Sequence, residues 1–401
     1  MVEVRPLSDL RVLDCSSFVA GPFATAILAE YGAEVIKVEP PAGGDPFRRF
    51  GTASGRPDAT LAFLSEARNK HCITLNLKDL RGADVFRRLA AESDVVCENF
   101  RPGTLERWGL GYDALSKANP GLVMLRITAY GQDGPYRDLP GFARIAHAFG
   151  GLTYLAGMPG ETPVTPGSTS LGDYMSGLFG VIGVLVALRQ RDKDGRGQEI
   201  DIGLYESVFR VLDELAPAYA KTGKVREPEG PGTVNACPHG HFPTGDGGWV
   251  AIACTSDKMF ERLARVMGRP ELAGPEAWGP VARRLAERER VDGLVADWTR
   301  SMPRDEVIGR CRAGQVPCGP INTIADIFAD PHYKARGNLL SLVDALAGEV
   351  VVPATPPRLS RTPARAEWLG RSLGADTDAV LERLLDLSPE AIAELRRDGV
   401  I

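Results

Sequence analysis

The stretch RVLDCSSFVAGPFATAILAEYGAEVIKVE, residues 11–39, contains two apolar strand patterns separated by one helical pattern. Arg11–Ser16 is predicted to be a buried strand, and Glu34–Glu39 the next strand. A helix is expected to open at Ala20-Gly21-Pro22, where proline suits the first turn, and to run to about Tyr31. The same alternation continues with strand patterns at 72–77, 94–98 and 122–130 and helical patterns at 82–91 and from Gly103. Strands alternating with helices predict an α/β fold with a parallel, doubly wound sheet.

The middle and the end of the chain are less regular. Residues 131–170 are rich in glycine, proline and threonine and are predicted to form a long connection. A helix at 171–191, a strand at 199–204 and a helix at 206–221 follow. After a second irregular stretch at 225–244, a strand at 249–254 and three short helices to about Arg312 indicate a smaller second domain at 225–325. Beyond the proline cluster after residue 350, Ser388-Pro389-Glu390 is a sound helix start.

Composition narrows the class of protein. Of 401 residues, 44% are hydrophobic and 25% charged, which is typical of a soluble globular protein. The formal charge of −5 offers no general attraction to nucleic acid or to an anionic membrane, so neither is expected as a partner. The amino terminus lacks the pattern of a signal peptide, and the apolar segment Leu178–Leu188 is about half the ~20 residues of a membrane span. A cytoplasmic location is therefore predicted. The seven cysteines form no CxxC pair and predict neither disulfides nor a zinc site.

A dinucleotide site is the first function to consider. Glu39 lies 18 residues after Gly21, close to where a ribose-binding acid would lie in such a site. The turn between them reads FVAGPF, however, and one glycine beside a proline does not let the backbone approach a pyrophosphate. This argues against NAD or FAD, although the start of the helix still offers free N–H groups to an anion or a carbonyl.

Asp173 is the second candidate. It is the only carboxylate in the apolar helical segment Leu171–Leu188, and it falls in the first turn. Aspartate is favoured there for structural reasons, since it accepts hydrogen bonds from free backbone N–H groups. A carboxylate kept ionised at a buried helix start is also suited to attack an acyl carbon. The pattern alone leaves both readings open.

Several segments together resemble the class III CoA-transferases, the family that contains formyl-CoA transferase and carnitine CoA-transferase. The matching segments are residues 11–39, RNKHCITLNL at 68–77, DVVCENFRPGTLERWGL at 94–110, SLGDYMSGLFG at 170–180, GRGQEIDIGLYES at 195–207, VPCGPI at 316–321 and DPHYKARG at 330–337. The resemblance covers nearly the whole chain. It implies a Rossmann-like large domain made from 1–224 and 326–401, a small domain at 225–325, and an interlocked homodimer.

The resemblance also implies a mechanism and a set of CoA contacts. Asp173 matches the nucleophile, which forms a mixed anhydride and then an aspartyl-CoA thioester. No permanently bound cofactor is expected, because CoA thioesters are the substrates. The residues that match CoA contacts are Ala20, Asn69, Lys70, Asn99, Phe100, Arg107 and the neighbouring Trp108. The alternatives for these residues are a helix-start asparagine, a core aromatic and a solvated surface arginine.

Departures from the family bear on the substrate. Val19 stands where the formyl-CoA enzymes carry a glutamine, and GPGTVNACPHGHF at 230–242 replaces their run of glycines. Arg144 would suit the far carboxylate of a dicarboxylic acid, while an ordinary surface arginine and, for His147, a hydrogen-bonded histidine are open alternatives. Val19, His147, Asn235 and His239 complete the predicted substrate-binding set, and no metal site is expected. The chain looks most like the branch that uses succinyl-CoA with malate or citramalate.

Three alternatives remain. A 2-methylacyl-CoA racemase shares the fold and needs an acid/base pair, but Phe142 stands where that subgroup has its histidine, and His147 lies five residues further on. A CoA-transferase for another acid, such as oxalate or mesaconate, is the second. A non-catalytic CoA-binding protein, which would not need Asp173, is the third.

Overall fold

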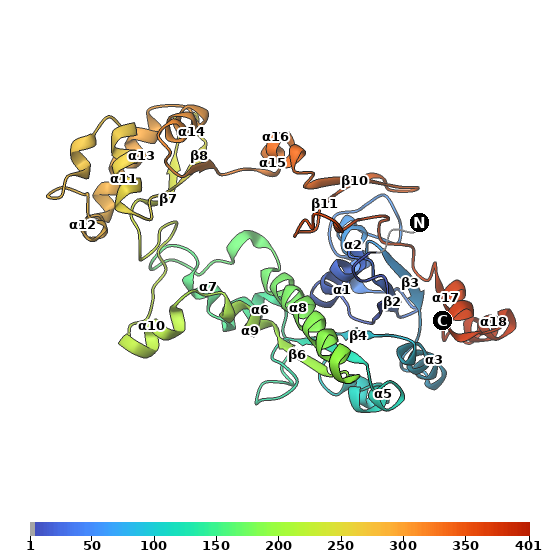
Figure 1. The fold of residues 1–401 in the computed structure, drawn as a ribbon. Coiled ribbons are helices and arrows are strands. Elements are labelled where there is room, and N and C mark those ends of the chain that lie inside the picture. Colours follow the sequence, from blue (N-terminus) through green and yellow to red (C-terminus); the bar gives the residue numbers. More distant parts are fainter. Residues whose placement is uncertain (1–4) are drawn as a thin grey trace. The chain divides into compact units, whose positions relative to one another are not determined.

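The computed structural model describes residues 5–401, and contacts divide the chain into two compact units (Figure 1). Unit 1 comprises the described residues up to Leu152 together with Gly167–Asp213 and His332–Ile401. Unit 2 comprises Thr153–Pro166 and Glu214–Pro331. The division into domains 1–224, 225–325 and 326–401 stays a prediction.

Unit 1 is built on a six-stranded sheet in the order β3-β2-β1-β4-β5-β6. Every neighbouring pair in it is parallel. The strands are β1 (Arg11–Asp14), β2 (Glu34–Glu39), β3 (Lys70–Thr74), β4 (Val95–Glu98), β5 (Val123–Thr128) and β6 (Glu199–Gly203). The predicted doubly wound parallel sheet is confirmed. The order reverses between β1 and β4, and ligands of such sheets bind beyond the carboxyl ends of the strands at that point.

Helices cover both faces of this sheet, as the ribbon shows (Figure 1). One face packs against α3 (Leu80–Ala91), α5 (Tyr112–Ala118), α17 (Thr377–Leu385) and α18 (Pro389–Arg397), around a core that includes Phe86 and Ile36. The other face packs against α1 (Ala20–Glu30), α6 (Ala143–Phe149), α8 (Leu171–Asp194) and α9 (Leu204–Arg210). Valine, leucine and isoleucine point to both faces from the central strands, which is why these strands read as continuous apolar runs.

Short helices were missed in the glycine-rich connection predicted at 131–170. It contains α6, α7 (Leu152–Leu155) and the 3₁₀ helix η2 (Pro166–Ser168). The single helix predicted at 206–221 is also wrong: α9 ends at Arg210, and α10 (Leu215–Thr222) starts anew after Asp213, whose φ of 47° lies in the left-handed region. The remaining helices of unit 1 are η1 (Pro46–Arg49), α2 (Leu61–Glu66), α4 (Thr104–Arg107) and α16 (Pro331–Ala335, which starts at the unit boundary).

The chain returns to unit 1 through a hairpin that the sequence did not predict. Antiparallel strands β10 (Leu339–Asp344) and β11 (Gly348–Pro353) place Val350 and Val352 against Phe63 of α2. Arg56 reinforces this return, because its guanidinium bonds to Asp344 at 3.0 Å and to the Gly370 carbonyl at 2.9 Å. The last helix begins as predicted, with the Ser388 hydroxyl accepting the Ala391 N–H.

Unit 2 has its own core. Its antiparallel sheet consists of β7 (His239–Pro243), β8 (Trp249–Ala253) and β9 (Cys318–Pro320). The helices are α10, α11 (Asp257–Val266), η3 (Pro270–Ala273), α12 (Val281–Ala286), α13 (Arg288–Arg300), α14 (Arg304–Ala313) and α15 (Ile324–Ala329). Phe260, Val295 and Val307 lie fully buried at the centre.

The apolar helix α8 is longer than Leu178–Leu188, the apolar segment that was compared with a membrane span from the sequence. Among the described residues it is long and apolar enough, by length and composition only, to cross a membrane, with a mean hydropathy of 1.8 over its most apolar window. In the structure it packs against α1, β5, β6 and α9, and 44% of that window is buried. A single helix of this kind is weak evidence for a membrane, since the core helix of a soluble protein has the same properties.

Candidate active site

The turn between β1 and α1 is held by three hydrogen bonds to two side chains, those of Asn99 and Asp45. The side-chain amide of Asn99, just after β4, bonds twice to Ser17: the Ser17 N–H donates to Oδ1 at 2.8 Å, and Nδ2 donates to the Ser17 carbonyl at 2.7 Å. The Phe18 N–H donates to Asp45 Oδ1 at 3.1 Å. Phe18 itself has a φ of 61°, a conformation that a bulky residue adopts only where its surroundings impose it. The start of α1, with Val19 and Ala20, is therefore rigidly placed at the switch point of the sheet.

Buried charges lie beneath this turn. Lys70 is fully buried and pairs with Asp14 at 3.0 Å, while Lys37 pairs with Asp45 at 2.9 Å and donates to the Ser16 carbonyl at 3.0 Å. Burial opposes ionisation of Asp14, but Lys70 and Lys37 outweigh it and lower the pKa of Asp14 to about 2. The network holds β1, β2 and β3 in fixed relation at the edge where the turn begins.

Asn69 and Lys70, both predicted to contact CoA, have structural partners here. Lys70 Nζ also donates to the Pro22 carbonyl at 2.6 Å and to Thr25 Oγ1 at 2.8 Å. Asn69 is buried, donates to the Arg365 carbonyl at 2.6 Å and accepts the Glu367 N–H at 2.7 Å. In this arrangement neither side chain is free to bind a phosphate.

Asp173 lies in the first turn of α8, facing the turn just described. No hydrogen bond or ion pair to its carboxylate is found within residues 5–401. Burial raises the pKa of Asp173 to about 7, although a helix start favours the charged form. Next to it, the ring of Tyr174 packs edge-on against Phe23 of α1, with centroids 4.8 Å apart. A desolvated carboxylate without a counter-ion is a better nucleophile than one in water.

One cavity of about 260 Å³ brings the two features together. Its lining includes five of the predicted site residues, namely Val19, Ala20, Asn99, Phe100 and Asp173. The other lining residues are Ser17, Phe18, Pro46, Ile127, Thr128, Ala129, Gly141, Phe142 and Leu204. None of these lining side chains is cationic, and Asp173 is the only carboxylate among them. The cavity therefore surrounds Asp173 with mainly apolar groups and provides no cation of its own.

A second cavity of about 200 Å³ adjoins the first, since Ser17 and Phe100 line both. Trp108 lies in its wall, half-buried, with its ring edge-on to Phe100 at a centroid distance of 5.5 Å. Lys78 is also in the wall. Arg107 is exposed and donates to Thr104 Oγ1 at 2.9 Å, and it lines neither cavity. The two cavities are therefore neighbours, one lined by Asp173 and the other by Trp108.

Arg144 and His147 both lie on α6, but their environments differ. Arg144 is exposed, whereas His147 is buried and its Nε2 accepts the Gly172 N–H at 2.8 Å. Burial, and then the charge of Arg144, lower the pKa of His147. Neither residue lines the cavity at Asp173.

The remaining two predicted residues belong to unit 2. Asn235 is exposed and lies 3.5 Å from Glu214 Oε1 through its Nδ2. His239 is half-buried in β7, opposite Ala253, and lines a cavity of about 400 Å³ with His241 and Cys318.

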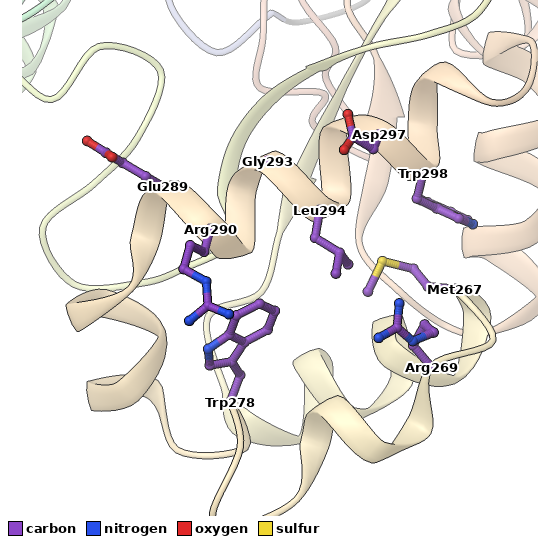
Figure 2. A pocket seen from close by; sticks show the side chains of 9 residues that line it. All are labelled: Met267, Arg269, Trp278, Glu289, Arg290, Gly293, Leu294, Asp297 and Trp298. Carbon is purple, nitrogen blue, oxygen red and sulfur yellow. The ribbon is translucent and has the colours of Figure 1, made fainter.

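A larger cavity of about 640 Å³ in unit 2 contains none of the predicted residues (Figure 2). In this cavity the guanidinium carbon of Arg290 lies 5.5 Å from the centroid of the Trp278 ring. Trp298, which is on α13 like Arg290, lines the other side. Within residues 5–401 no group of three metal-ligating side chains is found.

Asp45, Ser17 and Thr128 are among the residues at the site that the sequence did not predict. Asp45 was overlooked because its side chain bonds backbone N–H groups rather than a ligand, accepting from Phe47 at 2.9 Å as well as from Phe18. A signal did exist: all three follow or end strands of the predicted parallel sheet, and such positions meet at one edge.

Comparisons with known proteins agree with this geometry. The model of CoA-transferase family III matches residues 7–377. The alpha subunit of succinyl-CoA–L-malate CoA-transferase from Chloroflexus aurantiacus is 57% identical over all of this chain and 93% of its own length. The beta subunit of that enzyme is 56% identical over 99% of this chain and 98% of its own. The crystal structure of a CaiB/BaiF family protein from Brucella suis superposes with a TM-score of 0.83 at 33% identity, covering 95% of this chain and 99% of that one.

Proposed function

This chain belongs to CoA-transferase family III, and from that premise we propose that it moves coenzyme A from succinyl-CoA to L-malate or to the related acid citramalate. The enzyme class itself follows from the family and its relatives. The observation that carries the proposal is the position of Asp173, an unpaired carboxylate in a mainly apolar cavity that adjoins a second cavity lined by Trp108.

The proposed reaction starts with attack of a carboxylate oxygen of Asp173 on the thioester carbonyl carbon. The C–S bond breaks, CoA leaves as thiolate, and a mixed anhydride forms between Asp173 and succinate. The thiolate then attacks the Cγ carbonyl of Asp173, and succinate departs with the bridging oxygen. Malate repeats these steps in reverse, which yields malyl-CoA and regenerates the carboxylate. Free N–H groups at the start of α1 would stabilise the oxyanions.

CoA is proposed to lie along the two neighbouring cavities. Its adenine would pack on Trp108 and its pantetheine would pass Ser17 and Ala20, so that the sulfur reaches Asp173. Arg107, exposed near Trp108, is proposed to bind a phosphate at the entrance. The predicted CoA contacts of Asn69 and Lys70 have the least support, because both side chains are buried and occupied.

The acceptor's far carboxylate needs a cation that the cavity at Asp173 lacks. Arg144 on α6 is the proposed partner, and the substrate contacts of Asn235 and His239 stay predictions from the sequence. We also propose that the enzyme is a cytoplasmic homodimer. The chain is about equally similar to both subunits of the Chloroflexus enzyme, which is consistent with one chain serving in place of two.

The test is a CoA-transfer assay with succinyl-CoA and a panel containing L-malate, D-citramalate, mesaconate, glutarate and oxalate. Wild type is compared with Asp173→Ala and with Asp192→Ala, which removes an exposed carboxylate from the far end of the same helix. Malyl-CoA or citramalyl-CoA that forms with wild type and Asp192→Ala but not with Asp173→Ala supports the proposal. If the enzyme transfers no CoA but exchanges the α-hydrogen of a 2-methylacyl-CoA with solvent, it is a racemase and the proposed function is wrong.

Isotope labelling separates the anhydride route from direct transfer. When malate carries ¹⁸O in its carboxylates, one labelled oxygen should remain on Asp173 after turnover, detectable in the peptide that contains it. A covalent CoA adduct on Asp173 by intact-protein mass spectrometry is the second expected observation. CoA transfer with neither a labelled oxygen nor a CoA adduct on Asp173 would contradict the proposal of aspartyl intermediates.

A further inference from the structure

The first turn of α8, which carries Asp173, is tied down by a side chain from another helix. Ser170, the residue before the helix, makes no side-chain hydrogen bond to it. Helix starts leave several backbone N–H groups without partners. The Gly172 N–H instead donates to Nε2 of His147 at 2.8 Å, a bond buried between α6 and α8.

This bond defines the chemical state of the imidazole. Because Nε2 accepts a hydrogen bond, the ring is neutral and its proton is on Nδ1. His147 is 1% exposed, and its lowered pKa, which results from burial and then from Arg144, agrees with a neutral ring. Nδ1 has no hydrogen-bond partner within residues 5–401.

The packing around the bond leaves little freedom. A Cβ added at Gly172 would lie 3.3 Å from Cδ2 and 3.4 Å from Nε2 of His147, and 3.4 Å from a methyl of Val208 on α9. Ala146, next to His147, is buried in the core that contains Val184 of α8 and Val208. The imidazole thus joins a rigid α6 to the peptide group immediately before Asp173.

We propose that His147 is a positioning residue for Asp173: by accepting the Gly172 N–H it fixes the first turn of α8 and so the direction in which the carboxylate attacks the thioester. The inference rests on the proposed function. It assigns His147 a role other than the substrate contact that the sequence suggested. Small misplacements of a nucleophile are costly, about 100-fold in rate for an error near 1 Å.

The experiment compares His147→Leu with His147→Gln. Leucine fills similar space and cannot accept the bond, whereas the Oε1 of glutamine is able to accept it. The measurement is the rate at which a single turnover with succinyl-CoA forms the covalent CoA adduct, which requires acylation of Asp173 and then capture by the thiolate. We expect His147→Leu to lower this rate about 10- to 100-fold with an unchanged KM for malate, and His147→Gln to recover most of it.

Ile392→Ala is the control for a general loss of stability, because it creates a cavity beneath α18 on the other face of the sheet. It should lower the melting temperature without changing the acylation rate of the folded enzyme. A raised KM for malate with normal acylation in His147→Leu would make His147 a substrate contact and overturn the inference. Equal rates in His147→Leu and Ile392→Ala would overturn the inference as well. So would a rate in His147→Gln as low as that in His147→Leu.

A readout that does not depend on activity separates this inference from the proposed function. ¹⁵N spectra of the five histidines, assigned with His147→Gln, should show an unprotonated Nε2 and a protonated Nδ1 for His147 near pH 7.5. A proton on Nε2 would overturn the inference even if CoA transfer is normal. Absence of any CoA transfer by the wild type would instead refute the proposed function.

Discussion

Asn99 and Ser17 join the two strands between which the order of the sheet reverses. The amide of Asn99, beyond β4, both accepts from and donates to the backbone of Ser17, beyond β1, at 2.8 and 2.7 Å. Parallel strands at this point diverge into helices on opposite faces, which opens a crevice above their carboxyl ends. The two bonds close the base of that crevice, and Asp173 faces it from α8.

Replacing Asn99 should therefore damage the site more than the fold. Asn99→Ala removes two hydrogen bonds, at a cost of about 1–3 kcal/mol in the free energy of unfolding, and frees the turn that begins α1. We expect a raised KM for succinyl-CoA and a lower kcat. Asn119→Ala is the matched control, because Asn119 bridges the Ser93 carbonyl and the Gly121 N–H before β5, at the opposite edge of the sheet. Similar kinetic effects in both variants would contradict the assignment.

Asp173 should cost stability at neutral pH. Its pKa of about 7 in the folded protein lies above the ordinary value of 3.8, so the folded state binds more protons than the unfolded state between these pH values. Ionising this half-buried carboxyl therefore destabilises the fold progressively as pH rises from about 4 to 7. Asp173→Asn should be more stable than wild type by about 1–4 kcal/mol at pH 8, and the difference should disappear near pH 4. Urea unfolding of both proteins across this range measures it, and a constant difference would refute the burial argument.

Lys70 should prove structural. Lys70→Met leaves Asp14 buried without its nearest cation, and breaking such a pair costs about 3–5 kcal/mol. The second change Asp14→Asn should recover part of this loss, as a double-mutant cycle would reveal. The KM for succinyl-CoA of the folded fraction should stay within about twofold of wild type. A large rise in that KM with unchanged stability would instead support the CoA contact predicted from the sequence.

Gly177 should be needed for the approach of α8 to α1. A Cβ there would lie 2.8 Å from the Ala20 carbonyl oxygen and 2.8 Å from the Phe23 ring. Gly177→Ala must push α1 away one turn after Asp173, so both transfer activity and melting temperature should fall. Gly183→Ala on the same helix is the control, because its Cβ would meet only the side chain of Ile200, at 3.1 Å and more. Equal activity in the two variants would show that the close approach is not required.

Much of the candidate site was predicted from the family resemblance, whose motifs fall at strand ends and helix starts. Ala20, Asn99 and Asp173 each match such a motif, and all three line one cavity. Lys70 could not be judged in this way, since its partners Asp14 and Thr25 are more than 40 positions away. The local sequence around a lysine beside a strand is the same whether its side chain faces solvent or a buried aspartate.

The sequence by itself determined the local elements and the nucleophile candidate. Apolar runs marked β1, β2 and β5, Pro22 marked the start of α1, and the lone carboxylate in an apolar helix marked Asp173. Only the tertiary structure decided the strand order, the return of β10 and β11 to unit 1, and the bond from His147 to Gly172. The reason is physical: helix and strand patterns arise from neighbours a few positions apart. The pairing of distant groups depends instead on which surfaces the whole chain buries together, and short-range patterns carry no record of it.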